Sequence, residues 1–154
     1  MSKFNLEITN DCEILMCPKK RTKKIINILN KSKYKIYNGS LSIVFTSNKV
    51  IAEIHRKFLN NPLPTDVITF PGIRSEGVLG EIIISAEQAY INCKEYNNSF
   101  NNELSLYLIH GWLHLYGLND KNEEEIKIMR KAEKENLLLI NKNIVNMDFN
   151  LRYG

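Results

Sequence analysis

The chain has 154 residues, of which 44% are hydrophobic and 25% are charged, and its formal net charge is +4. This length fits one domain that can bury a core, and the composition is ordinary for a globular protein. No apolar run approaches the roughly 20 residues that a membrane span needs, which excludes a membrane-spanning protein. The mild positive charge allows an anionic partner such as nucleic acid without requiring one.

The N-terminus and the cysteines both bear on the compartment. The first ten residues alternate apolar and polar side chains and contain no signal-peptide core. Cys12, Cys17 and Cys93 are odd in number and lack a Cys-x-x-Cys spacing, so we interpret them as reduced thiols. These features predict a cytoplasmic location.

Strands and helices alternate through the first half of the chain. Residues 4–8 alternate between apolar and polar, as in a half-buried strand. Apolar residues at helical spacing predict a helix over residues 22–32, and β-branched and aromatic residues predict a strand over 41–46. Asn48 is a candidate N-cap for the next helix.

The second half begins with a loop at residues 60–64, which is rich in Asn and Pro. Short strands are predicted over residues 67–70 and over 78–84, the second of them a nearly continuous apolar run typical of a buried strand. Ser85 and Gln88 have the spacing of a capping box, which predicts a helix from there through Cys93.

The last two predicted helices complete the pattern. One begins at Asn101 or Asn102, and the other covers residues 123–141. Residues from about 142 to 154 lack periodicity and are expected to form a C-terminal tail. The order of elements predicts one α+β domain over residues 1–154, with a small four-stranded mixed sheet, about five helices and one face of the sheet mainly covered.

Basic residues crowd the start of the first predicted helix. Lys20, Arg21, Lys23 and Lys24 are candidates for contacts to the phosphates of a nucleic acid. The simpler interpretation of the same cluster is a solvated helix face.

The most informative stretch is His110-Gly111-Trp112-Leu113-His114, followed by Gly117 and Asp120. Two histidines four residues apart on a helix share one face and can bind one metal ion. Gly117 can end that helix and bring Asp120 back as a third ligand, which leaves the open coordination position of a catalytic zinc. A helical zinc peptidase has Glu directly after the first His, whereas this chain has Gly111.

Two neighbouring residues affect this interpretation. Glu103 lies on the same helical face and is a candidate to orient a ligating imidazole by a hydrogen bond. Asp120 has a second interpretation, because Asp120 and Glu123 also have the spacing of a capping box for the last helix. The sequence leaves both roles of Asp120 open.

Three segments resemble the YbeY family of zinc-dependent endoribonucleases. Thr65-Asp66-Val67-Ile68-Thr69-Phe70-Pro71 is similar to the family's Thr-Asp-Val-Leu-Ser-Phe-Pro, and Leu79-Gly80-Glu81-Ile82 is similar to Leu-Gly-Asp-Ile. The third segment is His110-Gly111-Trp112-Leu113-His114-Leu115-Tyr116-Gly117. The resemblance spans about residues 41–132, and the order and spacing of the three segments agree with the family.

The resemblance implies a one-domain α+β fold similar to the metzincin core, with one zinc ion per chain. It also implies cleavage of single-stranded RNA in rRNA maturation and ribosome quality control. The implied partners are rRNA and the small ribosomal subunit or its proteins.

The chain departs from the family pattern at two positions. Asp120 stands where the family has its third His ligand, and Leu59 stands where the family tends to carry an Arg. Arg56 or Lys57, one turn earlier, is the candidate to replace that cation in catalysis. Glu81 or Asp66 is a candidate proton acceptor, although Asp66 with Thr65 also suits a loop-to-strand turn.

Three hypotheses follow, in order of preference. The first is a metal-dependent endoribonuclease, in which the metal polarises a phosphoryl oxygen or activates water. The second is a ribosome assembly factor with a structural metal and little catalysis, which the changes at Leu59 and Asp120 motivate. The third is a metallopeptidase, against which Gly111 argues.

Overall fold

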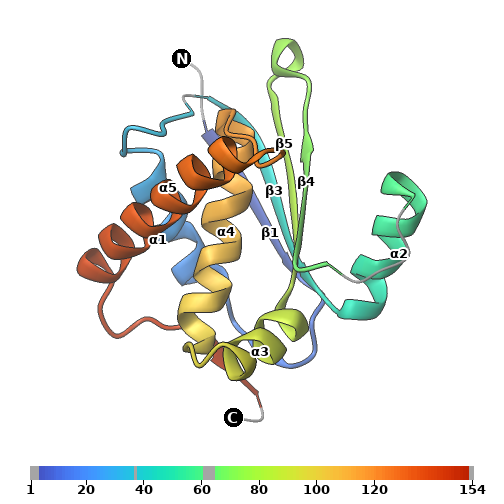
Figure 1. Cartoon of the computed structure of the whole chain (residues 1–154), viewed down its shortest axis with the longest axis vertical. Helices are drawn as coiled ribbons and strands as arrows, with labels where there is room; N and C mark the ends of the chain where they lie inside the picture. The colour runs from blue at the N-terminus through green and yellow to red at the C-terminus, as the bar shows by residue number, and fades with distance from the viewer. Residues whose placement is uncertain (1–3, 37, 61–64, 153–154) are drawn as a thin grey trace.

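The computed structural model describes residues 4–36, 38–60 and 65–152. Its centre is a four-stranded mixed sheet in the order β1-β3-β5-β4 (Figure 1). The strands are β1 (Phe4–Asn10), β3 (Gly39–Thr46), β5 (Val78–Ser85) and β4 (Val67–Pro71). The first three are parallel, and β4 pairs antiparallel with β5 at the edge of the sheet. The predicted α+β class and mixed sheet are confirmed.

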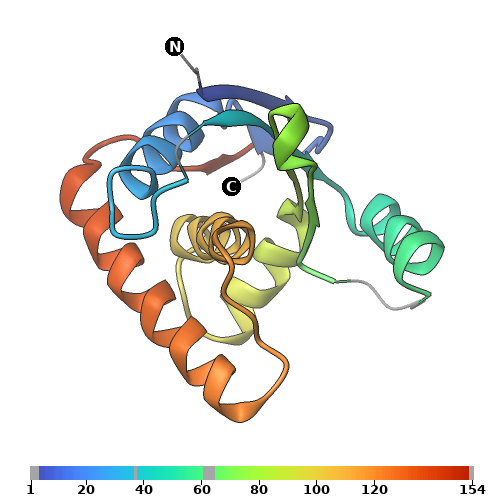
Figure 2. The same ribbon diagram turned by 90° about the horizontal axis from the view of Figure 1, so that it is seen from above.

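In the described part of the chain, four α-helices lie on one face of the sheet and one lies on the other. Figure 2 shows α4 at the middle of the helical layer, with α1, α3, α5 and the sheet around it. Nine of the seventeen residues of α4 are buried, which explains why this helix is apolar on nearly every side. The helices are α1 (Lys19–Leu29), α2 (Asn48–Leu59), α3 (Ala86–Glu95), α4 (Phe100–Tyr116) and α5 (Glu123–Asn143).

A glycine lets α4 approach the sheet closely. A Cβ atom added at Gly111 would lie 2.6 Å from Cγ2 of Ile82 on β5, far inside van der Waals contact. Because Ile82 faces α4, the neighbouring Glu81 points to the opposite face of the sheet. On that opposite face, Ile51 of α2 packs with Ile68 and Ile83 in a small second cluster.

Serine and asparagine side chains fix the starts of the helices. The cap of α2 is Ser47, whose hydroxyl accepts a hydrogen bond from the backbone of Val50, so the prediction of Asn48 as the cap is wrong. Ser85 caps α3 by accepting from Gln88, as predicted. The helix α4 begins just after its cap, Ser99, slightly earlier than predicted.

Residues 149–151, within the segment that we predicted to be a C-terminal tail, pack back onto the domain. Phe149 is buried, and β6 (Asn150–Leu151) pairs antiparallel with β2 (Leu15–Met16). The Arg21 side chain is 2% exposed and donates hydrogen bonds to the Ser105 hydroxyl and the Met147 carbonyl. Arg21 therefore holds this segment against α4 by hydrogen bonds and is not available to RNA. The prediction of Arg21 as an RNA contact is corrected.

Two smaller points concern the end of α2 and the search for a membrane-spanning helix. Asn60 ends α2 in the left-handed conformation, and the rest of the predicted loop, residues 61–64, lies outside the described residues. Among the described helices, none combines the length and apolarity needed to cross a membrane.

Candidate metal centre

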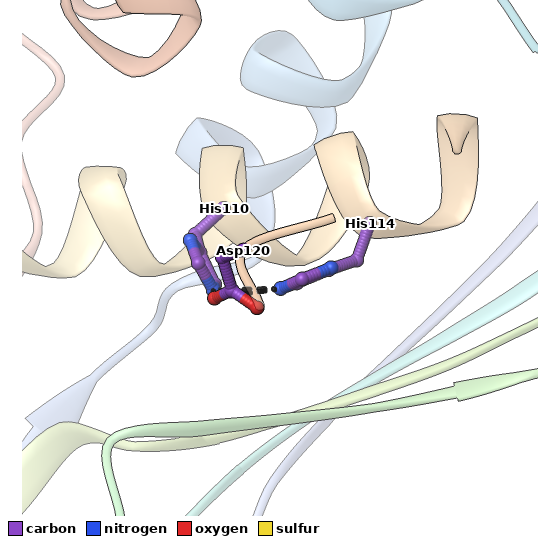
Figure 3. A group of neighbouring side chains, drawn as sticks. All are labelled: His110, His114 and Asp120. Carbon is purple, nitrogen blue, oxygen red and sulfur yellow. Dashed lines mark hydrogen bonds and ion pairs between the residues drawn. The ribbon is translucent and has the colours of Figure 1, made fainter. Parts of the chain in front are cut away.

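The C-terminal half of α4 carries two histidines on the side that faces β4. Figure 3 shows the rings of His110 and His114 converging with the carboxylate of Asp120. The two Nε2 atoms are 3.0 Å apart, and Oδ2 of Asp120 lies 3.5 Å from His110 Nε2 and 3.4 Å from His114 Nε2. A tetrahedral zinc with ligand bonds of 2.0–2.2 Å needs ligand atoms about 3.3–3.6 Å apart, which is close to these separations.

The opposite nitrogens of both rings are already engaged. Nδ1 of His110 lies 2.7 Å from Oε2 of Glu133, and Nδ1 of His114 lies 2.9 Å from the carbonyl oxygen of Leu118. Both partners only accept hydrogen bonds when Glu133 is ionised, so each neutral ring donates from Nδ1 and keeps its lone pair on Nε2. Two lone pairs that face each other at 3.0 Å, beside a carboxylate, form a donor set that suits a cation.

A tight turn brings Asp120 to the histidines. Gly117 ends α4 with φ +127°, a conformation that side chains rarely adopt, and its N–H bonds to the carbonyls of Leu113 and His114. The cap of α5 is Asn122, which accepts from the backbone of Glu125. The helix-cap role considered for Asp120 therefore belongs to Asn122, and the carboxylate of Asp120 faces the imidazoles.

Glu133 on α5 anchors the centre from behind. Its carboxylate is nearly buried and also accepts two hydrogen bonds from Arg130, at 2.7 and 2.9 Å. Burial raises the pKa of Glu133, but hydrogen bonds from His110 and Arg130 outweigh burial and hold that pKa below its usual value. An ionised Glu133 fixes the tautomer and orientation of His110, the role that we predicted for Glu103. Glu103 instead accepts a hydrogen bond from Asn98.

Two cavities meet at this centre, and both include His110, Asp120, Asp66 and Val67 in their walls. The first, of about 420 Å³, lies toward β4 and the end of α2 and also contains His114. The second, of about 400 Å³, runs between α3, α4 and α5. A small molecule can therefore approach these three side chains from either side, unlike in a closed structural zinc site.

The other predicted catalytic residues lie apart from the histidines. Arg56 and Lys57 are exposed on α2, and the residues of that helix that line the first cavity are His55 and Leu59. Glu81 lines a groove on the opposite face of the sheet, so its assignment as a proton acceptor at this centre is corrected. Period-two alternation on β5 is the physical reason, because Ile82 takes the side that faces α4.

The predicted RNA contacts on α1 are also distant from the centre. Lys20, Lys23 and Lys24 are exposed, whereas Arg21 is buried. Figure 2 places α1 beside α4 and α5 on the flank away from β4, and Figure 3 shows the histidines pointing toward the strands. These lysines do not share a cavity with His110 in the described part of the chain.

Sequence reasoning missed Glu133 and Arg130. A signal for Glu133 exists, because it falls beside Met129, Ala132 and Asn136 on the buried stripe of α5. A carboxylate on a buried stripe is rarely left without a partner. Its partner could not be read from the sequence, since His110 lies 23 residues away on another helix.

Comparisons with known proteins identify a family for this chain. Residues 7–141 match the family model described as Endoribonuclease YbeY. A protein named Endoribonuclease YbeY from Carboxydothermus hydrogenoformans is 39% identical over 99 residues, which cover 63% of this chain and 69% of that protein. One of the same name from Phocaeicola vulgatus is 35% identical over 102 residues, covering 66% of this chain and 74% of that protein.

A solved structure also matches. The solution structure of TM1509 from Thermotoga maritima superposes with a TM-score of 0.61 and 29% sequence identity. The match covers 90% of this chain and 93% of that one. The shared architecture therefore covers nearly the whole domain.

Proposed function

Because the chain belongs to the Endoribonuclease YbeY family, we propose that it cleaves single-stranded RNA in a metal-dependent reaction. The observation that carries the proposal is the convergence of two Nε2 atoms and one carboxylate at the meeting point of two cavities. Such a centre combines a metal-binding donor set with access for a substrate.

The proposed cofactor is one zinc ion, held by His110, His114 and Asp120. Two imidazoles and a carboxylate are donors that zinc accepts, and three protein ligands leave a position for substrate or water. When bound, zinc would supply Lewis acidity toward a phosphoryl oxygen or lower the pKa of a water molecule. Asp120 is negatively charged, whereas the third histidine of the family is neutral. The centre with Asp120 therefore carries less net positive charge, and its metal ion would be a weaker Lewis acid than one held by three histidines.

Residues of the chain near the centre have two candidate roles in the reaction, as a proton acceptor and as contacts to phosphates. Asp66 lines both cavities with His110, and its Oδ1 already accepts a hydrogen bond from the backbone of Val67. The other carboxylate oxygen of Asp66, Oδ2, is not used in this hydrogen bond. Asp66 therefore replaces Glu81 as the candidate proton acceptor at this centre. Arg56 and Lys57 line neither cavity, but they are exposed in the last turns of α2 and remain candidate contacts for RNA phosphates.

The two competing hypotheses are less well supported. A purely structural metal does not need the open approach that both cavities give to Asp120 and His110. A peptidase of the helical zinc type needs a general base at position 111, where Ile82 fills the space that a side chain would take. The site therefore favours phosphodiester chemistry with another proton acceptor.

The proposal extends to the biological substrate. We propose rRNA as the RNA that is cut, with the small ribosomal subunit or its proteins as partners, on the basis of family membership. A cytoplasmic location fits the absence of a disulfide among Cys12, Cys17 and Cys93, which are all free.

An RNA cleavage assay tests the proposed function. The purified protein is mixed with end-labelled RNA containing one single-stranded and one duplex segment, with zinc, with a chelator, or with zinc restored after chelation. We expect cuts only in the single-stranded segment, lost with chelator and regained with zinc, and at least about 100-fold slower in His114→Ala. Cleavage that persists in His114→Ala at the rate of the unmodified protein would refute the proposal.

A further inference from the structure

The cavity between α3, α4 and α5 has a mixed lining that the metal centre alone does not explain. At one end it contains His110, Asp120 and the Arg130–Glu133 pair. At the other end it contains an aromatic side chain and a carboxylate, Tyr96 and Glu103. Its volume of about 400 Å³ falls in the range of small-molecule sites.

Tyr96 gives this cavity an aromatic wall that is open to a ligand. Its side chain is 69% exposed at the C-terminal end of α3, which is unusual for a large aromatic residue. Exposed aromatic rings on the path of an RNA strand serve as stacking platforms for unpaired bases.

The carboxylate of Glu103 determines which part of an RNA fits at this end. Glu103 lies two helical turns before His110, on the same face of α4 and roughly 10 Å along its axis. Its Oε1 accepts from Asn98, and the Tyr107 hydroxyl is a second hydrogen-bond partner of the carboxylate. An ionised carboxylate has about four acceptor positions, so sites remain for a ligand. A carboxylate with free acceptor sites binds a base edge that carries N–H donors.

Arg130 gives the opposite end a cation. One guanidinium nitrogen, NH1, holds both oxygens of Glu133. Across the described residues, no hydrogen bond occupies the other two nitrogens, and the side chain is 64% exposed. Arg130 is therefore placed to donate to an RNA phosphate beside the metal ligands.

We propose that this cavity binds one nucleotide of the RNA substrate, with its phosphate toward Arg130 and its base between Tyr96 and Glu103. The inference rests on the proposed function and adds a base preference to it. Guanine presents two adjacent N–H donors on its Watson–Crick edge and is the base that one carboxylate accepts best. Uracil presents a single donor between two acceptors and fits Glu103 poorly.

Equilibrium binding to metal-stripped protein tests the inference without cleavage of the RNA. The probes are short fluorescent oligouridylates with or without one central guanine, and the readout is fluorescence anisotropy. We expect the guanine probe to bind more tightly to the unmodified protein. Tyr96→Ala should weaken that binding about 10-fold, and Tyr96→Phe should restore it. The phenylalanine variant separates stacking from any loss of folding.

The base preference has its own variant and control. Glu103→Gln keeps the acceptor for Asn98 but adds an amide donor, so we expect the affinities for the two probes to become equal. Glu95→Gln, an exposed residue on α3, should leave the preference unchanged. Equal binding of both probes by the unmodified protein, or wild-type binding by Tyr96→Ala, would overturn the inference. Zinc-dependent cleavage of oligouridylate by the unmodified protein would show that the proposed function stands even then.

Discussion

The geometry of the two imidazoles depends on the groups that hold their Nδ1 atoms. For His114 that group is the carbonyl of Leu118 in the turn after α4, and for His110 it is the buried Glu133. Each acceptor fixes a tautomer, so that both Nε2 atoms point into one place. The candidate metal site is therefore built from five residues, of which three would touch the metal.

Glu133→Gln tests this support directly. The amide has the same shape but no charge, so His110 loses its anionic acceptor and Arg130 its ion pair. We expect zinc affinity to fall about 10- to 100-fold, measured by competition with a chromophoric chelator. Glu124→Gln, an exposed residue on the same helix, should bind zinc as the unmodified protein does. Equal affinities for the two variants would contradict the role of Glu133.

Sequence alone predicted that His110 and His114 share one helical face, because their spacing is a local feature, and it left open whether Asp120 joins them. It did not predict Glu133, whose contact depends on how α5 crosses α4. The same limit explains the assignment of Glu103 to His110. Both lie on one face of α4, but Asn98 at the start of that helix takes the Glu103 carboxylate.

At the scale of secondary structure, the approach of α4 to β5 sets the position of the histidines relative to the sheet. Gly111 lies against Ile82 in this contact, and Gly80 on β5 lies under Leu115. A Cβ atom at Gly111 would push the helix away from the strand, and one at Gly80 would clash with the Phe70 carbonyl oxygen of β4 and lie 2.8 Å from the Leu115 side chain. The centre would then shift relative to Asp66 and Val67, which belong to the β4 side of the cavities.

Gly111→Ala tests the close contact between α4 and β5, because the contact decides whether the substitution raises or lowers the free energy of unfolding. In an exposed helix, replacing Gly by Ala stabilises by about 0.5–1 kcal/mol, but overpacking a core costs about 1–3 kcal/mol. We expect a net loss of about 1–2 kcal/mol in the free energy of unfolding, measured by urea denaturation. Ile82→Ala in the same chain should remove the clash, so the double variant should lose less than the sum of the single losses. A stabilised Gly111→Ala would contradict the close contact.

Strand and helix types were predictable because their apolar periodicity is strong, whereas boundaries depended on competing caps. Ser47 and Asn48 are both good N-caps, and the structure uses Ser47 because Asn48 bonds across to Ser85 and Gln88. The short pair β2 and β6 was missed, since strands of two residues carry no period.

At the scale of the whole molecule, a buried arginine closes the fold around the C-terminal segment. Arg21 on α1 reaches Ser105 on α4 and the carbonyl of Met147, and its guanidinium lies 5.3 Å from the ring centre of Phe149. Because lysines surround Arg21 in the sequence, we had interpreted it as part of an exposed basic cluster and not as a buried structural residue. Only the packing of three distant segments shows that this cation faces inward.

Arg21→Ala separates a structural cation from an RNA contact. Loss of buried, charge-assisted hydrogen bonds should lower the free energy of unfolding by about 2–3 kcal/mol, measured by urea denaturation. Lys24→Ala on the same helix should change stability by no more than about 0.5 kcal/mol, because its side chain is exposed. Arg21→Ala with unchanged stability but weakened RNA binding would reverse this assignment.

Metal binding should also stabilise the whole domain. Zinc at about 100 times its dissociation constant adds about 2.7 kcal/mol to the free energy of unfolding. For a domain of this size, that corresponds to a rise in Tm of about 5–10 °C, measured by circular dichroism with and without chelator. The rise should disappear in His110→Ala, and an equal rise in that variant would place the stabilising zinc elsewhere.

The central claim is that His110, His114 and Asp120 hold one metal ion, and elemental analysis of the purified protein tests it most directly. We predict about one zinc per chain in the unmodified protein and a loss of most of it in both His114→Ala and Asp120→Ala. Zinc that is retained at full occupancy in Asp120→Ala, or absent from the unmodified protein even after zinc is supplied, would contradict the claim.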